Sequence, residues 1–191
     1  MPLSGYQKRT LQKRKDILSA AKDLVSQVPL AQISIHDIAS QAKVSQVTIY
    51  NIFESKNNLI FEAVKEISKE DVDDIFAVIS SDLPYPKRIE EYFRHSFAHT
   101  LKRPQVNALL SFIFDEKNAE LAKYVFSLYE KTYFYLQKMY LDGRKDGFIR
   151  EDITVDLFFK ILNIYVRIDR SFLIDEKERE IIIETIRQSF Q

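Results

Sequence analysis

Apolar residues recur at helical spacing along most of the chain. Near the N-terminus, six of them follow i, i+3, i+4 positions over three turns: Ile17, Ala20, Ala21, Leu24, Val25 and Val28. This pattern predicts an amphipathic helix, which should end near Pro29 because proline disfavours a helical conformation in the residue before it. Two shorter patterns follow, over 35–42 and 46–53. Ser34 and Ser45 precede them, where serine commonly caps a helix.

The rest of the chain has helical patterns too. They predict long helices at 56–79, 87–102, 119–142, 154–173 and 176–190, with a shorter helix starting at Pro104. Ser55 should cap the first of these, and the turn-forming stretch 80–88 should end it. Gly143 and Gly147 should end the helix at 119–142, which has apolar residues on more than one face and is therefore expected to be largely buried.

Composition favours an all-α fold. Apolar residues make up 46% of the chain and charged residues 29%, whereas there are only 3 Gly and 5 Pro among 191 residues. Such a chain is rich in helix formers and poor in the turn residues of sheet proteins. The sequence contains no cysteine, which excludes disulfides, thiolate zinc sites and cysteine nucleophiles.

Nothing in the sequence suggests a membrane segment. No uninterrupted apolar run reaches the roughly 20 residues that a membrane helix needs. The N-terminal sequence MPLSGYQKRTLQKRKD lacks the apolar core of a secretory signal. We therefore expect a cytoplasmic protein without a membrane partner.

The formal net charge of zero conceals an uneven distribution. Residues 1–58 contain eight Lys or Arg and four Asp or Glu, and five of the positive charges fall within residues 8–15. A basic N-terminal arm on an acidic body suggests that a polyanion binds at this end. On charge alone, a merely solvated basic tail explains the pattern equally well.

The stretch KVSQVTIYNIFESK (43–56) interleaves apolar residues with uncharged polar ones. Five apolar side chains can pack inward in this region: Ile38, Ala42, Val44, Ile49 and Ile52. This is the spacing of a helix-turn-helix, whose second helix enters the DNA major groove. Six residues are left facing outward: Ser45, Gln46, Val47, Thr48, Tyr50 and Asn51. Hydroxyls and amides suit phosphate oxygens and base edges, and valine suits a thymine methyl, so we expect this face to contact DNA.

These residues resemble the DNA-binding domain of the TetR (tetracycline-repressor) family. The resemblance covers about residues 14–64, through RKDILSAAKDLV and ISIHDIASQAKVSQVTIYNIFESKNNLIFEAV. The segment LDGRKDGFIREDITVDLF (141–158) also resembles the family's passage into its dimerisation helices. The resemblance implies an all-α protein of about nine helices. Residues 1–55 would form a three-helix DNA-binding domain, and residues 56–191 an effector-binding and dimerisation domain.

The resemblance also implies roles for the residues of the third helix. Ser45 would cap the helix and contact phosphate. Gln46 and Val47 would read bases, Thr48 would contact a base or a phosphate, and Tyr50 would reach the DNA backbone. Each of these residues also has an ordinary structural explanation, as a cap or as surface polarity, when it is considered alone.

Four other positions complete the predicted DNA-binding set. Lys56 would bind a phosphate at the start of the fourth helix. His36 occupies a position that is often basic in relatives, which implies a phosphate contact there too. Lys43 stands where the family usually has a left-handed glycine, so we expect backbone strain there, together with a phosphate contact. Asn51 differs from the aromatic or histidine residues common at its position.

The C-terminal half is rich in aromatic residues, most of which should fill a helical core. The resemblance implies a small-molecule effector pocket, and five residues are predicted to line it: Tyr92, His95, Phe112, Tyr129 and Tyr133. We expect a largely apolar effector. A second set on the last two helices is predicted to form a homodimer interface: Phe158, Phe159, Leu162, Val166, Ile182, Ile186 and Phe190.

Taken together, the sequence predicts a dimeric transcriptional regulator, in particular a repressor that a small effector releases from a palindromic operator in double-stranded DNA. An alternative is a helix-turn-helix protein controlled by a protein partner without a small-molecule effector. A third, an all-helical metal-dependent hydrolase, would use Glu91, His95 and His99, which share one helical face. We predict no catalytic residue, no metal and no cofactor, because no nucleophile motif or phosphate-binding glycine loop is present.

Overall fold

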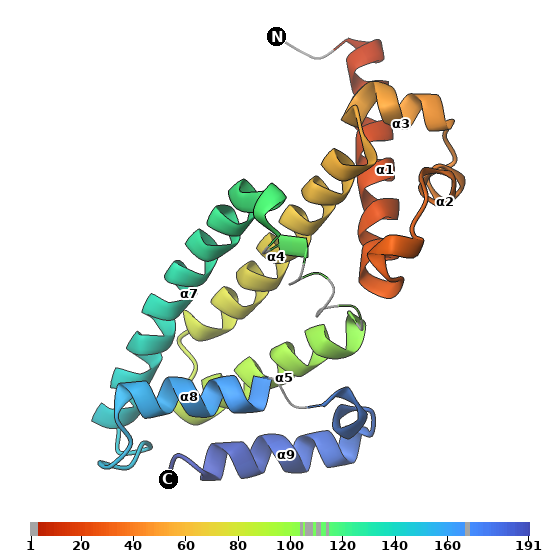
Figure 1. Cartoon of the computed structure of the whole chain (residues 1–191). Coiled ribbons are helices and arrows are strands. Elements are labelled where there is room, and N and C mark those ends of the chain that lie inside the picture. The colour runs from red at the N-terminus through yellow and green to blue at the C-terminus, as the bar shows by residue number, and fades with distance from the viewer. Residues whose placement is uncertain (1–3, 104, 106–108, 110–111, 114, 167–168) are drawn as a thin grey trace. The chain divides into compact units, whose positions relative to one another are not determined.

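The computed structural model describes residues 4–103, 105, 109, 112–113, 115–166 and 169–191. Every regular element within these residues is helical (Figure 1), which confirms the predicted all-α class. The α-helices are α1 Gly5–Gln27, α2 Ile35–Gln41, α3 Gln46–Phe53, α4 Lys56–Ile79, α5 Tyr85–Lys102, α7 Ala119–Lys145, α8 Val155–Val166 and α9 Glu176–Gln188. Short 3₁₀ turns lie at Leu30–Gln32, Glu116–Asn118 and Arg170–Leu173. None of the described helices is long and apolar enough to cross a membrane.

The chain divides into two compact units. The first unit comprises Met1–Lys69 and Gln105–Val125, and the second comprises Glu70–Pro104 and Phe126–Gln191. The predicted boundary between residues 55 and 56 coincides with the start of α4. The first turns of α4 nevertheless belong to the first unit, because their apolar side chains are buried in its core.

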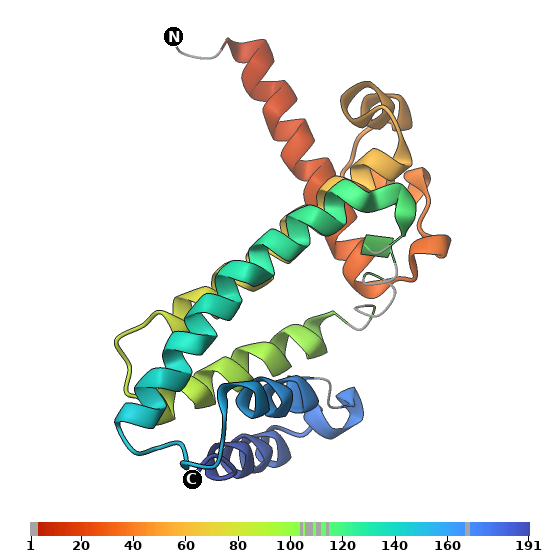
Figure 2. The ribbon, with the colours of Figure 1, turned by 60° about the vertical axis from the view of Figure 1, so that its left-hand side comes forward.

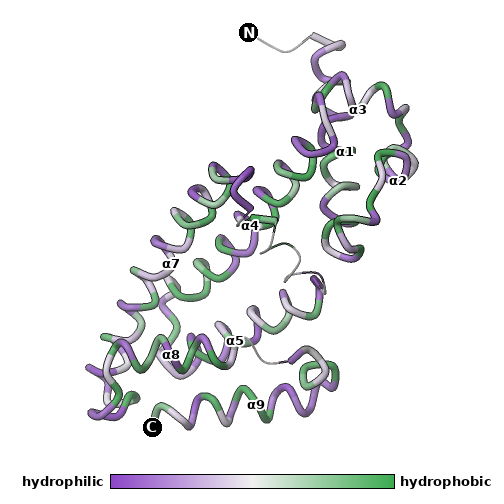
Figure 3. Tube along the Cα trace, in the orientation of Figure 1, coloured by the Kyte–Doolittle hydropathy of each residue, from purple (hydrophilic) through white to green (hydrophobic). Residues whose placement is uncertain are grey.

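The core of the first unit joins α1, α2, α3 and the start of α4. Ile17 and Ala21 of α1 and Ile38 of α2 are fully buried in it, as are Ile49 of α3 and Leu59 of α4. The two short helices could not hold their shape alone, since an isolated helix of two turns is unstable in water. Burial against α1 and α4 therefore fixes which faces of α2 and α3 remain exposed. Along the Cα trace, apolar and polar positions alternate at helical spacing (Figure 3).

The predicted basic arm is the beginning of α1 rather than a separate segment. Ser4 caps the helix, and its side chain and that of Gln7 bond reciprocally to each other's backbone N–H groups. Such a capping box satisfies two of the backbone donors that a helix start leaves unpaired. Every residue from 5 to 13 is exposed. Lys8, Arg9 and Lys13 are thus carried on a preformed, solvent-exposed helical turn.

The core of the second unit is aromatic. In this unit, α5 packs against α8 and α9 (Figures 1 and 2). Phe93 and Phe97 of α5 are buried with Phe158 of α8 and with Phe190, which follows α9. The Phe158 and Phe190 ring centroids lie 5.2 Å apart. The expectation that aromatic residues fill a helical core is confirmed for these four.

Helix α7 differs from its prediction in two ways. It continues through Gly143, which lies so close to the Tyr85 ring that an added Cβ would be 2.6 Å from Tyr85 Cε2. Gly147, with a φ of 75°, provides the left-handed residue after the helix end. The helix is also not largely buried, since five large apolar residues on it are more than half exposed: Phe126, Tyr129, Tyr133, Phe134 and Leu141.

Helix α8 is shorter than predicted. The sequence pattern extends to residue 173, but α8 ends at Val166 and a 3₁₀ turn spans Arg170–Leu173. Asp169 caps that turn, because its carboxylate accepts a hydrogen bond of 2.8 Å from the Ser171 backbone N–H. This local capping interaction starts a new element within the predicted helix. The predicted helix starting at Pro104 falls mostly outside the described residues.

Candidate nucleic-acid interface

Helix α2 starts at a complete cap. The Ser34 Oγ accepts a hydrogen bond of 3.2 Å from the Asp37 backbone N–H, and the Asp37 carboxylate accepts one of 3.0 Å from the Ser34 N–H. The hydrogen bonds from the Ser34 side chain and backbone lower the pKa of Asp37. The predicted N-cap at Ser34 is confirmed, and it orients the short helix before it packs.

The turn between α2 and α3 is closed by two backbone hydrogen bonds. The Val44 N–H donates to Ala39 O at 3.0 Å, and the Lys43 N–H donates to Ser40 O at 3.2 Å. This nested pair is the Schellman arrangement, whose central residue is left-handed and usually glycine. Lys43 occupies that position with a φ of 54°. The predicted left-handed conformation at Lys43 is thus confirmed, and the turn forms without glycine because the two bonds and the packing on either side hold it.

Helix α3 is capped by Ser45. Its Oγ accepts a hydrogen bond of 3.2 Å from the Thr48 backbone N–H and lies 2.9 Å from the Thr48 hydroxyl. The cap predicted at Ser45 is therefore confirmed. Because the two hydroxyls already contact each other, each keeps only part of its hydrogen-bonding capacity for an external partner.

The packing of α3 separates an inner from an outer face. Ile49 and Phe53 are buried, while Gln46, Tyr50 and Asn51 are exposed. Val47 is 66% exposed. This outer face thus carries an apolar side chain beside an amide and a phenol, and α3 contains no charged residue. Five of the six residues predicted to face outward are exposed, whereas Thr48 is half-buried. The sequence analysis did not identify Phe53 as a buried residue of this helix.

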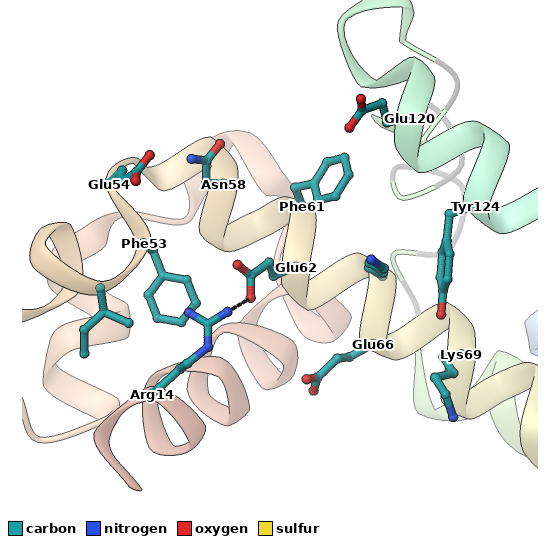
Figure 4. A pocket seen from close by; sticks show the side chains of 12 residues that line it. Arg14, Phe53, Glu54, Asn58, Phe61, Glu62, Glu66, Lys69, Glu120 and Tyr124 are labelled. Atoms are coloured by element: carbon teal, nitrogen blue, oxygen red, sulfur yellow. Dashed lines mark hydrogen bonds and ion pairs between the residues drawn. The ribbon is translucent and has the colours of Figure 1, made fainter. Parts of the chain in front are cut away.

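Arg14 has a role that the sequence did not suggest. Its guanidinium lies over the Phe53 ring, 4.5 Å from the centroid, and pairs with the Glu62 carboxylate of α4 (Figure 4). The side chain therefore links α1, α3 and α4 and is not simply part of a free basic arm. Only a contact between distant residues, 48 positions apart in the chain, distinguishes it from its basic neighbours.

Helix α4 begins beside this helix-turn-helix. Ser55 caps it, accepting a hydrogen bond of 3.1 Å from the Asn58 backbone N–H, and Lys56 is its first residue. The ammonium group of Lys56 is close enough to Asp37 to help lower the pKa of that carboxyl. A lysine thus lies at the positive end of the α4 dipole, near the start of α2.

His36 of α2 is exposed and lies next to the outer face of α3. Its Nδ1 is 3.5 Å from Nε2 of Gln46. The resemblance predicted that His36 contacts a phosphate, and the structure does not test this prediction. The contact with Gln46 joins the first turns of the two short helices on their exposed side.

Two hollows open on the surface of the first unit. One, of about 720 Å³, is lined by residues of α1, α3, α4 and α7 that include Arg14, Phe53, Glu62 and Tyr124 (Figure 4). The other lies between α1 and the turn at Lys43. Neither contains any of the five predicted effector residues.

Four of these five residues belong to the second unit. Tyr92 is buried in α5, and burial raises the pKa of Tyr92 to about 12. Tyr129 and Tyr133 of α7 are 53% and 52% exposed. The Tyr133 ring stacks on Phe159 of α8 with the centroids 4.2 Å apart. We call Tyr92, Tyr129, Tyr133 and Phe159 the aromatic patch.

The patch as defined does not include the other two predicted effector residues. His95 is half-buried on α5. Phe112 packs against the core of the first unit, whereas the aromatic patch belongs to the second unit.

The predicted dimer residues mostly lie inside their own chain. Phe158, Leu162, Ile186 and Phe190 are at most 2% exposed, so they offer no surface to a second copy, and this part of the prediction is wrong. Phe159 and Ile182 are partly buried, and the Val166 side chain lies outside what the structure describes. The pattern was misassigned because α8 and α9 carry two apolar stripes. The exposed stripe consists of Leu157, Ile164 and Ile181.

Two of the three residues of the hydrolase alternative, Glu91 and His99, have other partners. Glu91 pairs with Arg94 at 2.5 Å. His99 Nδ1 lies 2.5 Å from Asp71 Oδ1, and its Nε2 lies 3.4 Å from Asp74. Burial lowers the pKa of His99, while the Asp74 carboxylate acts in the opposite direction. Within the described ranges, no group of three potential ligands is arranged to hold a metal ion.

The left-handed Lys43 leads to a prediction about stability. Replacing Lys43 by glycine should raise the free energy of unfolding by about 1 kcal/mol, because glycine adopts this conformation without a Cβ clash. Lys43→Ala is the matched control, since it removes the lysine but keeps a Cβ and should change stability by less than about 0.5 kcal/mol. Urea unfolding measures both. Equal stabilities of the two variants would show that Lys43 is not strained.

Comparison with known proteins agrees with this architecture. The model of the family described as bacterial regulatory proteins, tetR family, matches residues 17–63. No curated protein sequence matches the chain. Among solved structures, a putative TetR-family transcriptional regulator from Vibrio parahaemolyticus is 20% identical, with a TM-score of 0.65 over 92% of this chain and 96% of that one.

Two other structures were solved with ligands. The regulator FadR from Bacillus subtilis, in complex with stearoyl-CoA, is 16% identical with a TM-score of 0.62, covering 92% of this chain and 96% of that one. A putative transcriptional regulator from Saccharomonospora viridis, in complex with choline, is 20% identical with a TM-score of 0.66, covering 93% and 92%. At these identities the likeness shows the fold alone. The family model matches the segment that holds the helix-turn-helix, and the fold of this chain resembles that of solved TetR-family regulators.

Proposed function

We propose that this protein is a dimeric, ligand-responsive repressor that binds a palindromic operator in double-stranded DNA. The observation that carries the proposal is the outer face of α3, where Gln46, Val47, Tyr50 and Asn51 are exposed without a charged residue among them. Such a face suits base edges, which offer hydrogen-bonding groups and methyls rather than full charges.

The residues of this interface take different parts in binding. Gln46 and Val47 read bases, whereas Ser45, Thr48, Tyr50 and Asn51 contact phosphate or adjacent bases. Lys56 holds a phosphate at the positive end of α4. Lys43 and His36 supply further contacts at the rim, and the exposed basic turns of α1 add electrostatic attraction to the DNA backbone.

This division of roles predicts different outcomes for two variants. Lys56→Ala should weaken binding to all sequences about equally and reduce the salt dependence by about one released counterion. Gln46→Ala should instead relax the preference at one or two base pairs, each worth about 1–3 kcal/mol. Fluorescence anisotropy with a set of single-base operator variants, at several salt concentrations, measures both effects.

Glu120→Ala is a suitable control for this experiment, because Glu120 is exposed on α7 rather than on the helix-turn-helix. It should leave both affinity and preference unchanged. If Lys56→Ala changed the base preference while Gln46→Ala did not, the assigned roles would be reversed.

The dimer is proposed to form through the exposed stripe of α8 and α9. Ile164 is 68% exposed and Ile181 59%, and Leu157 lies two turns before Ile164 on the same face of α8. Pairing two such helices with their copies forms a four-helix, two-fold interface that removes this apolar surface from water. A two-fold dimer also explains why the operator should be palindromic.

A charge placed on this stripe should therefore prevent dimerisation. Ile164→Glu would bury a carboxylate without a partner, and should produce a folded monomer at micromolar concentration in analytical ultracentrifugation. Leu141→Glu is the control, because Leu141 is 57% exposed on α7, outside the stripe. A wild-type monomer, or a dimer that survives Ile164→Glu, would contradict this interface.

The effector is proposed to bind at the aromatic patch of the second unit. Tyr92, Tyr129, Tyr133 and Phe159 come from α5, α7 and α8, and none of them carries a charge while the phenols stay protonated. Phenols are protonated at neutral pH, so the hydroxyls of Tyr92 and Tyr129 can both donate a hydrogen bond. Aromatic walls with two fixed donors suit a largely apolar ligand that has a polar end.

Helix α4 provides a covalent connection between the two units. It begins at Lys56 in the first unit and ends at Ile79 in the second. An effector that favours one arrangement of the second unit can thus change the spacing of the two recognition helices in the dimer. The ligand must bind the two states with different affinity to do so.

Stearoyl-CoA, the ligand of one structural neighbour, is the first probe, and choline is the second. We expect stearoyl-CoA to bind through its apolar acyl chain, and its affinity to fall some 5–150-fold in the presence of operator, because coupling of about 1–3 kcal/mol must be reciprocal. Isothermal titration with and without operator measures this. Tyr133→Ala should weaken binding, whereas Leu141→Ala should not. Equal affinities with and without operator would show that the ligand is not an inducer.

One observation favours the alternative control by a protein partner. Phe126 and Phe134 on α7 are 56% and 61% exposed. Exposed aromatic residues of this kind are common at protein interfaces. Under this alternative, no small molecule would alter operator affinity, while Phe126→Ala and Phe134→Ala would impair regulation without affecting DNA binding.

A further inference from the structure

We propose that His36 is a positioning residue that decides which end of the Gln46 amide faces the DNA, and thereby sets the base preference of α3. This inference rests on the proposed function, because it concerns how the recognition helix reads its operator. It assigns to His36 a role in specificity that differs from the phosphate contact expected from its position.

The geometry brings the two side chains together at the exposed edge of the helix-turn-helix. His36 is the second residue of α2 and Gln46 the first residue of α3. Nδ1 of the imidazole lies 3.5 Å from Nε2 of the amide, at the outer limit of a hydrogen bond. Across the described part of the chain, no other side chain is bonded to the Gln46 amide.

The chemistry of an amide makes this contact directional. One end of the Gln46 side chain is a carbonyl acceptor and the other an amino donor. A neutral imidazole whose Nδ1 lacks a proton can only accept there, so it attracts the amino end. The carbonyl Oε1 is then turned outward, where it accepts a hydrogen bond from adenine N6 or cytosine N4.

Protonation of His36 reverses the arrangement. Both ring nitrogens of an imidazolium are donors, so Nδ1–H attracts the Oε1 of Gln46 and the amino group turns outward. That group donates to guanine O6 and N7 or to thymine O4. The same recognition helix would thus prefer different bases in the two protonation states of one histidine.

The charged groups around His36 are few. Asp37 follows it on α2, with a carboxylate that Ser34 holds and that interacts with His36 and with Lys56 of α4. Helix α3 itself, QVTIYNIF, contains no ionisable residue other than Tyr50. The carboxylate of Asp37 and the ammonium of Lys56 have opposite charges.

Two substitutions imitate the two states. His36→Lys is a permanent donor at this position, and His36→Glu is an acceptor at any pH well above about 4.3. His36→Ala removes the contact. Since a change of charge alters affinity for all sequences alike, the informative quantity is the ratio of affinities among four operators that differ only at the base pair read by Gln46. That base pair is identified as the one whose preference Gln46→Ala abolishes.

The experiment measures these ratios by fluorescence anisotropy at about pH 8 and about pH 5.5, on either side of the usual histidine pKa. The wild type should prefer adenine or cytosine at the higher pH and shift about fivefold or more toward guanine or thymine at the lower pH, a change typical of one hydrogen bond. His36→Glu should keep the first preference and His36→Lys the second, at both pH values. His36→Ala should show no shift with pH.

Identical ratios for the wild type at both pH values, together with unchanged ratios in the Lys and Glu variants, would overturn the role of His36. DNA binding would persist in that case, and the proposed function would stand. Failure of the proposed function would look different, because the wild-type protein would then select no DNA sequence at all.

Discussion

The burial of one face of two very short helices is the constraint on which the DNA-binding end depends. Helices α2 and α3 have seven and eight residues, too few to be stable alone. Ile38 and Ile49 are fully buried against α1 and α4, and Phe53 anchors the end of α3 beneath the Arg14 guanidinium. Because this packing fixes the inner face of α3, Gln46, Val47 and Tyr50 face outward. The apolar core thus determines the register in which polar side chains are presented to a partner.

Local chemistry explains which features could be predicted from the sequence. Ser34, Ser45 and Ser55 each cap the helix that was expected to follow them, because a cap depends on residues only three positions apart. The left-handed Lys43 was also predictable, since its turn needs two nested hydrogen bonds whatever the side chain. The basic segment 8–15 was expected to be an arm, yet a capping box at Ser4 makes it helical.

Contacts between distant residues explain what the sequence could not predict. Periodicity identified apolar stripes on α8 and α9, but it could not say which stripe faces the chain's own core. Phe158 and Leu162 are buried there, so the apolar residues that α8 leaves exposed are Leu157 and Ile164 instead. In the same way, the aromatic residues of α7 suggested a buried helix, whereas Tyr129 and Tyr133 are half exposed. The pairing of Arg14 with Glu62 likewise depends on tertiary structure.

We propose that the face of α3 presented by this packing reads a DNA sequence, and selection of bound duplexes from a random pool is the decisive experiment. We expect enrichment of one two-fold symmetric motif, with half-sites centred roughly one helical turn (about 34–36 Å) or somewhat more apart. The preference should weaken at defined positions when Gln46 and Val47 are both replaced by alanine. A pool that shows no enriched motif, or one that enriches the same motif with the doubly substituted protein, would contradict this proposal.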